Sequence, residues 1–145
     1  MIKIKMAEQF KILTQFVKDM SSETPNVETY LYVKEYLKNY NLDIDITTKP
    51  LKNRMIEINT KLSYVDKGKS KNKSHFEINY ASIIEIDEKI KDRKIIEKII
   101  LCDVQKEIYP NLEKVFISLL STSGFPGIKF EKKVDFEQLY NQRLN

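Results

Sequence analysis

Several residue types on which enzymes and metal proteins depend are scarce in this chain. Its 145 residues include one histidine, one cysteine and three glycines. A single cysteine excludes an internal disulfide framework and a cysteine-based zinc site, and three glycines leave no glycine-rich phosphate loop. The lone His75 occupies a polar position in an alternating segment, which is typical of an exposed side chain rather than a catalytic base. We therefore expect a protein that is not an enzyme and that holds no metal.

Long hydrophobic runs are also missing. No apolar run approaches the ~20 residues of a membrane-spanning helix, and Met1–Phe10 has lysines but neither the apolar core nor the cleavage site of a secretory signal. Together with the single cysteine, this predicts a cytoplasmic protein without direct membrane insertion. An apolar fraction of 41% is ordinary for a globular protein. We expect one domain over residues 1–145, with an N-terminal tail at 1–9 and a C-terminal tail at 141–145.

The net charge of +4 comes largely from one short segment. Between Asp66 and Lys73, four lysines alternate with Gly, Ser and Asn, a composition that favours a solvated turn. A phosphate-binding loop would need more glycines and a helix start directly behind it. A basic module that binds nucleic acid through this turn stays an alternative hypothesis, but we expect no nucleic-acid partner.

Alternation of apolar and polar residues predicts an antiparallel sheet. A period of two is typical of strands with one buried and one wetter face. A first strand is expected at Ile12–Val17, and alternating segments follow at 42–46, 56–64 and 76–80. Short turns between these segments favour antiparallel pairing of neighbouring strands.

The period changes to that of helices in the last third of the chain. Asp87 is positioned to cap a short helix that runs to about Leu101. A second helix is expected to start near Tyr109–Pro110 and to end at Gly124, and Asp135 is positioned to cap a last short helix. Strands followed by helices predict an α+β fold, a four-stranded antiparallel sheet with two main helices packed on one side.

Residues 27–40 hold four tyrosines and allow two interpretations. Tyr30, Val33, Leu37 and Tyr40 share one face if the segment is helical. The tyrosines either cover the core or form a wall of an apolar groove that binds extended polypeptide, because tyrosine gives a large contact area at low entropy cost. The residues alone leave both the conformation and the role open.

Two further features are candidates for chemistry. Asp43 and Asp45 point to one face of a strand, but the sequence places no histidine or third acid nearby, which favours a solvated strand face over a metal site or an acid–base pair. Cys102 follows an Ile-Ile-Leu run, which predicts a small buried side chain rather than a reactive thiol.

Five motifs in order resemble the SecB family of export chaperones. The motifs are Lys18–Asn26 (Lys-Asp-Met-Ser-Ser-Glu-Thr-Pro-Asn), Leu42–Asp45, Phe76–Ala81, Ile108–Pro110, and Gly124–Pro126 followed by Val134–Tyr140. The first of these motifs predicts an extended segment that ends in a polar turn, and this turn carries Asp19 and Glu23. Each motif is short, but their order and spacing match over roughly residues 10–142.

The resemblance implies both a fold and a function. Family members share the four-stranded α+β fold, assembled as a homotetramer that is a dimer of dimers. They hold unfolded preproteins in the cytoplasm without ATP or another cofactor and pass them to the SecA motor. The resemblance also implies that 27–40 is an extended crossover loop rather than a helix. A SecB-like chaperone dedicated to another client, such as an antitoxin, is the alternative within the family.

The resemblance also assigns residues to three surfaces. The client-binding groove would involve Val27, Tyr30, Leu31, Tyr40, Leu42, Ile44 and Leu119. The SecA-docking surface would involve Asp19, Glu23 and Glu77. The subunit interface would involve the strand that bears Phe76, Ile78 and Tyr80.

The chain departs from the family pattern in three ways. Its net charge is basic, whereas family members are usually acidic. Ser82 stands where the family has glycine, and His75 stands where the family has an apolar residue. A basic net charge weakens the expected attraction to a cationic partner, unless the acidic face survives locally.

Overall fold

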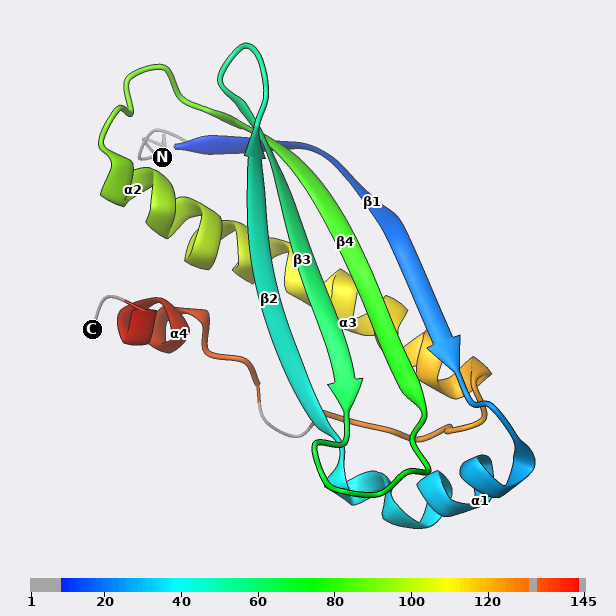
Figure 1. Ribbon diagram of the computed structural model, residues 1–145. Coiled ribbons are helices and arrows are strands. Elements are labelled where there is room, and N and C mark those ends of the chain that lie inside the picture. The colour runs from blue at the N-terminus through cyan, green and yellow to red at the C-terminus, as the bar shows by residue number, and fades with distance from the viewer. Residues whose placement is uncertain (1–8, 131–132, 144–145) are drawn as a thin grey trace, which may run out of the picture.

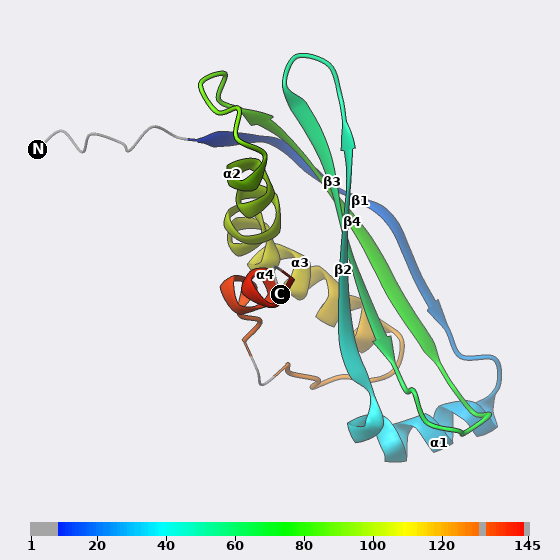
Figure 2. The ribbon, with the colours of Figure 1, turned by 60° about the vertical axis from the view of Figure 1, so that its left-hand side comes forward.

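The computed structural model describes residues 9–130 and 133–143, which form a four-stranded antiparallel sheet with the long helices on one face (Figures 1 and 2). The strands are β1 (Phe10–Glu23), β2 (Asn41–Pro50), β3 (Met55–Val65) and β4 (His75–Ile86). Their order in the sheet is β1-β4-β3-β2, so β1 and β2 are the two edges. The predicted α+β fold is confirmed.

Strand β1 is longer than predicted, which changes the position of two acidic residues. It continues through Glu23 instead of ending near Val17. Asp19 and Glu23 therefore lie within the strand, and the polar turn expected at these residues is wrong. Register shifts after Ile12 and after Val17 interrupt the pairing with β4. Such bulges break the period of two, so the alternation in the sequence stops before the strand does.

The connection between the two edge strands is helical. Helix α1 (Val27–Tyr36) and a 3-10 turn, η1 (Leu37–Asn39), cross the end of the sheet from β1 to β2 (Figure 1). Asn26 begins the helix, because its side-chain oxygen accepts a hydrogen bond of 2.8 Å from the backbone N–H of Thr29. The extended crossover loop implied by the family resemblance is therefore wrong, and the helical alternative is confirmed.

One long helical stretch packs against the sheet (Figure 2). Helix α2 (Arg93–Lys98), a π-helical turn, η2 (Ile99–Asp103), and helix α3 (Val104–Thr122) follow one another without a break. Fully buried apolar side chains from the sheet and from α3 form the centre of the core: Ile58, Leu62, Phe76, Ile78, Ile84, Ile108, Leu112, Phe116 and Leu120. The amphipathic pattern of α3 explains why this helix lies flat on the sheet.

The predicted starts of the two main helices are wrong. Asp92 caps α2, because its Oδ1 accepts a hydrogen bond of 2.9 Å from the N–H of Lys94. Asp87 instead accepts from the N–H of Lys89 in a turn. Pro110 lies inside α3 rather than in its first turn. It is exposed, so water can bond the helix carbonyl that a proline leaves without a donor.

The end of the helical layer agrees with the sequence prediction. Gly124 follows α3 with a φ of 102°, the left-handed conformation that ends many helices. Asp135 caps helix α4 (Phe136–Arg143), since its Oδ1 accepts a hydrogen bond of 3.0 Å from a backbone N–H of the helix. The C-terminal tail expected at 141–145 is therefore partly helical, and the tail expected at 1–9 lies almost entirely outside the described residues.

Candidate functional site

The face of the sheet that the helices leave open, here called the outer face, carries the acidic residues of the predicted docking surface. The register places Asp19 opposite Asn79 and Glu23 opposite His75, and Glu77 lies between these two partners on β4. Alternate residues of a strand share one face. The structure therefore brings Asp19, Glu23 and Glu77, here called the acidic set, onto the outer face, although they are far apart in the sequence.

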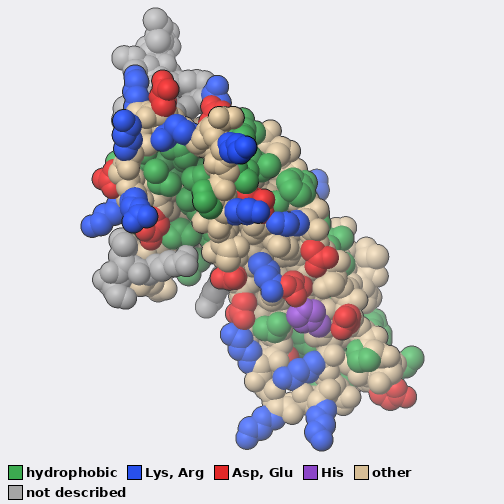
Figure 3. All heavy atoms as spheres, turned by 45° about the horizontal axis from the view of Figure 1, so that its top comes forward, with side chains coloured by type: hydrophobic (Ala, Val, Ile, Leu, Met, Phe, Trp, Pro, Cys, Tyr) green, Lys and Arg blue, Asp and Glu red, His purple; other side chains and the backbone are tan. Residues whose placement is uncertain are grey.

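Ion pairs connect the strands across the outer face. Nζ of Lys61 on β3 lies 2.5 Å from Oε1 of Glu77, and Nε2 of His75 lies 2.8 Å from Oε2 of Glu77. Nζ of Lys18 lies 2.7 Å from Oε2 of Glu57. Lys61 first and His75 second lower the pKa of Glu77, and Lys18 has the same effect on the pKa of Glu57. Figure 3 shows acidic and basic side chains around the single histidine.

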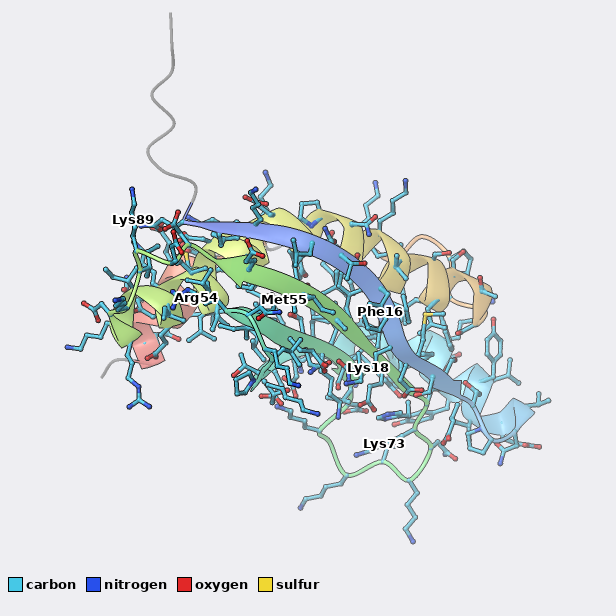
Figure 4. All side chains as sticks on the ribbon, turned by 90° about the horizontal axis from the view of Figure 1, so that it is seen from above. Phe16, Lys18, Arg54, Met55, Lys73 and Lys89 are labelled. Atoms are coloured by element: carbon cyan, nitrogen blue, oxygen red, sulfur yellow. The ribbon has the colours of Figure 1, made fainter. Side chains whose placement is uncertain are left out.

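The open edge of β1 exposes apolar side chains, which edge strands normally avoid. The exposed fractions are 44% for Phe16, 41% for Val17 and 45% for Met20. Phe16 and Lys18 lie along the bent part of this strand (Figure 4). Met20 also lines an open groove between β1 and α3, together with Leu119 and other residues of α3. Apolar surface on an unpaired edge is typical of an interaction site.

A second exposed apolar surface lies on α1. Val27 is 67% exposed and Leu31 is 57% exposed, and residues four apart are neighbours on a helix surface. Tyr30 holds the helix in place, because its hydroxyl donates a hydrogen bond of 2.7 Å to the backbone oxygen of Gly124. Its ring also lies 5.1 Å from the ring of Phe125, centroid to centroid. One side of α1 is thus fixed to the protein while the other faces solvent.

The seven residues predicted for the client-binding groove do not line one groove. Leu42 and Ile44 lie on edge strand β2, where they pack partly against the core. Leu119 lies beside β1, at the opposite edge of the sheet. Tyr40 is buried, with its hydroxyl hydrogen bonded to the backbone of Ser74, so it offers little surface to a client. The most exposed of the seven are Val27 and Leu31 on α1.

The three side chains predicted for the subunit interface belong to the core of a single chain. Phe76 and Ile78 are fully buried, and Tyr80 is 3% exposed. The hydroxyl of Tyr80 donates to Oε1 of Gln15 and accepts from Nδ2 of Asn111, both at 2.8 Å. Because the chain's own helices cover these side chains, they offer little surface to a second subunit, and the assignment of this strand to the subunit interface stays a prediction.

A groove at the β2 edge was missed by the sequence analysis. Ile46 of β2 lies in it with Ile96 of α2 and with Ile100 and Leu101 of η2. Figure 3 shows apolar side chains framed by lysines and arginines at the end of the molecule where α2 lies. The alternation around Ile46 was visible in the sequence, but only the fold brings it next to the π-helical turn.

The candidate residues for catalysis or metal binding lie apart from one another in the part of the chain that the structure describes. Cys102 is fully buried, as predicted, and burial raises the pKa of its thiol. Asp43 pairs with Lys67 at 3.1 Å. Within residues 9–130 and 133–143, no group of three or more His, Cys, Asp or Glu side chains is placed to hold a metal ion. In the same ranges, no helix is both long enough and apolar enough to span a membrane.

The lysine-rich segment Asp66–Lys73 lies in the connection between β3 and β4, as its turn composition predicts. The loop projects away from the sheet, and Lys73 lies far from Arg54 and Lys89 at the other end (Figure 4). Nζ of Lys73 donates a hydrogen bond of 2.5 Å to the backbone oxygen of Gly68. The loop thus bonds partly to itself while most of its lysines face solvent.

Known proteins resemble this chain over nearly its whole length. The sequence model of the family described as "Preprotein translocase subunit SecB" matches residues 3–145. A protein from Pelagibacter ubique (strain HTCC1062), provisionally named protein-export protein SecB, is 54% identical over 140 residues, which are 97% of this chain and 100% of the relative. The protein-export protein SecB of Parvibaculum lavamentivorans is 26% identical over 137 residues, 94% of this chain and 80% of the relative.

The fold is also found in a solved structure. It is a SecB-like chaperone of Mycobacterium tuberculosis in complex with a peptide from an antitoxin, and it superimposes with a TM-score of 0.65. The match covers 87% of this chain and 88% of the other, with 8% sequence identity. At this identity the likeness concerns the fold alone.

Proposed function

Because the chain belongs to the SecB family of protein-export chaperones, we propose that it holds unfolded preproteins in the cytoplasm and delivers them to the SecA motor. Members of this family are chaperones rather than enzymes. The observation that carries the proposal is the acidic set. Two of its members come from the first family motif and one from the third, and the register of β1 and β4 brings all three onto the outer face.

Docking to SecA would use the acidic set as its central contact. Clustered carboxylates attract a cationic partner, and such complementarity governs the association rate and the choice of partner. The net charge of +4 opposes this attraction. At physiological salt, however, exposed charges are screened beyond about 8 Å. The local cluster of carboxylates on the outer face therefore affects a docked partner more than the net charge of the whole chain does.

Client holding would use the exposed apolar surfaces. An unfolded preprotein exposes scattered apolar side chains, and apolar contact is not directional, so one surface can accept many sequences. Val27 and Leu31 on α1 offer such surface. Several weak contacts on linked subunits strengthen one another through effective concentration. Holding of this kind requires no nucleotide.

Assembly as a homotetramer, a dimer of dimers, would cover the open edge of β1. Support comes from the exposed apolar side chains on that edge and from the groove that Met20 lines. Met20→Lys should therefore lower the mass measured by light scattering. Thr47→Lys, at an exposed position of the opposite edge strand β2, is the matched control and should leave the mass unchanged.

The experiment that tests the function combines two measurements on one sample. Light scattering gives the mass of the assembly, and a second assay follows the aggregation of a reduced, unfolded client without nucleotide. The proposal expects a mass of four chains and suppressed aggregation. A monomer that leaves client aggregation unchanged would overturn it.

Two other functions are less well supported. A chaperone dedicated to an antitoxin is suggested only by the partner in the Mycobacterium tuberculosis structure, which shares 8% identity with this chain, whereas the relatives that match along the chain are named for protein export. Nucleic-acid binding through Asp66–Lys73 would weaken steeply with salt. The test is a titration of wild type and of a variant with the four lysines neutralised, using DNA and RNA at two salt concentrations. Binding that falls with salt and is lost in the variant would support this function.

A further inference from the structure

The outer face contains one lysine in the middle of its acidic residues. The strand register forms a row across all four strands: Asp19, Asn79, Lys61 and Asp45. Glu77 belongs to the neighbouring row, diagonal to Lys61. Residues on these diagonals are within reach of long side chains. Lys61 thus lies on β3 between Glu77 of β4 and Asp45 of β2, beside the acidic set.

Glu77 is already occupied by partners from its own chain. Lys61 holds Oε1 at 2.5 Å, and His75 lies 2.8 Å from Oε2. Only 23% of the Glu77 side chain is exposed, compared with 45% for Lys61. A cation from a partner protein can approach Glu77 only by displacing one of these contacts or by sharing the carboxylate with it.

An exposed ion pair of this kind is weak enough to be exchanged. Lys61 is about half exposed, and such pairs contribute little to stability because water screens them. A docked partner can therefore displace Lys61 from Glu77 at a small cost in free energy, and this cost lowers the partner's affinity for the outer face. Lys61 also adds positive charge next to Asp45, and Glu77 first, with Asp45 to a smaller extent, raises the pKa of Lys61.

We propose that Lys61 is an internal counter-ion that competes with the cationic docking partner for Glu77 and so limits the affinity of the outer face. The inference rests on the proposed docking of SecA and adds the residue that sets its strength. A lysine is well suited to this role, because its ammonium is a flexible point charge that can leave one carboxylate without losing a fixed geometry.

The chain provides a matched control in Lys18. It is 46% exposed, on the same face, and its ion pair with Glu57 resembles that of Lys61 with Glu77 in length and exposure. Glu57, however, is not a member of the acidic set. Lys18→Gln and Lys61→Gln remove the same charge from the same face, but only Lys61→Gln frees Oε1 of Glu77.

The test is a binding titration of purified SecA with the full chain at physiological salt. Lys61→Gln should bind about two- to fivefold more tightly than wild type, as loss of a competing surface pair predicts, and Lys18→Gln should change affinity less than Lys61→Gln. In a Glu77→Gln background, Lys61→Gln should have lost most of its effect. Equal gains for the two lysine variants, or no gain for Lys61→Gln, would overturn the inference.

Failure of the docking proposal would look different. If wild type does not bind SecA, or if Glu77→Gln binds as tightly as wild type, the proposed function is wrong and the inference falls with it. A measurement without SecA tests the pair itself. An NMR titration of the Glu77 carboxyl should give a higher pKa in Lys61→Gln than in wild type, and an unchanged pKa would show that Lys61 does not hold Glu77 in solution.

Discussion

The two faces of the sheet can be compared along a single strand. On β4, Ile78 and Ile84 point toward the helices and are fully buried, while Glu77 and Asn79 point to the outer face. The 12 residues of this strand thus supply both surfaces, because consecutive side chains alternate. The buried face is constrained by packing against α3, whereas the outer face is free to carry charge. Stability and docking therefore rest on different residues and can be changed separately.

The largest effect is expected on the buried face. Ile78→Ala should lower the free energy of unfolding by about 3 kcal/mol, because it removes buried methyl groups and leaves a cavity. On the outer face, the exposed Asp45→Asn should change it by less than about 0.5 kcal/mol. Urea unfolding would measure both variants at one chain concentration, since the stability of an oligomer depends on concentration. Similar losses of unfolding free energy for Ile78→Ala and Asp45→Asn would show that the two faces contribute equally to stability.

The junction between α1 and the helical layer gives the next largest effect. A Cβ added at Gly124, where φ is 102°, would lie 2.7 Å from Cε1 of Tyr30. Gly124→Ala should therefore cost about 2 kcal/mol or more, since it adds a clash to the strain of a positive φ. Gly127→Ala is the control, because its φ is 82° but no atom lies within 4 Å, so the conformational cost of about 1 kcal/mol should stand alone. Equal thermal shifts would argue against a tight contact between Tyr30 and Gly124.

The exposed face of α1 should affect client holding and leave stability unchanged. Leu31→Asp places a charge where a client would make apolar contact. We expect client affinity to fall about three- to tenfold, because a client would cover the 57% of Leu31 that is exposed, and so about half of the ~1.5–3 kcal/mol that full burial of a leucine contributes. Asn39→Asp adds the same charge in the adjacent exposed turn and should have little effect. The measurement is the concentration of chaperone that halves client aggregation. Unaltered holding by Leu31→Asp would remove α1 from the client surface.

The smallest effect concerns the pH dependence of stability. Lys61 and then His75 hold the pKa of Glu77 below its ordinary value of 4.5. The folded chain therefore binds this proton less tightly than the unfolded chain, so the pair stabilises the fold above the ordinary pKa and loses its effect as pH falls through the lowered value. Between pH 6 and pH 3, Lys61→Gln should lose less unfolding free energy than wild type, and the difference should be less than about 1 kcal/mol. Parallel curves for wild type and Lys61→Gln, measured by urea unfolding from pH 6 to pH 3, would contradict this.

The sequence predicts the sheet well, because alternation in β2, β3 and β4 reports directly which side chains are buried. It also predicts the end of α3 at Gly124 and the start of α4 at Asp135, where a single residue decides the backbone. It fails in β1, whose bulges after Ile12 and Val17 break the period. At α1 the two interpretations of residues 27–40 disagree. The helix allowed by the residue pattern is confirmed, and the extended loop implied by the family resemblance is wrong.

The remaining failures depend on long-range contacts. The π-helical turn joins what the periodicity shows as two helices, and buried Gln105 helps to hold it through hydrogen bonds with Thr60 and with the backbone oxygen of Ile100. No pattern around Gln105 reveals a partner 45 residues away. The acidic set was named from the resemblance alone, and its shared face became visible only through the register. Lys61 was missed because its ion pair also depends on that register.

The central claim is that docking and client holding use separate surfaces. The most direct measurement compares wild type with Asp19→Asn/Glu77→Gln in two assays on one preparation, affinity for purified SecA and suppression of client aggregation. The account predicts a loss of SecA affinity of about tenfold, as removal of two charges from a complementary contact implies, with client holding unchanged. Loss of both activities together, or of neither, would contradict it.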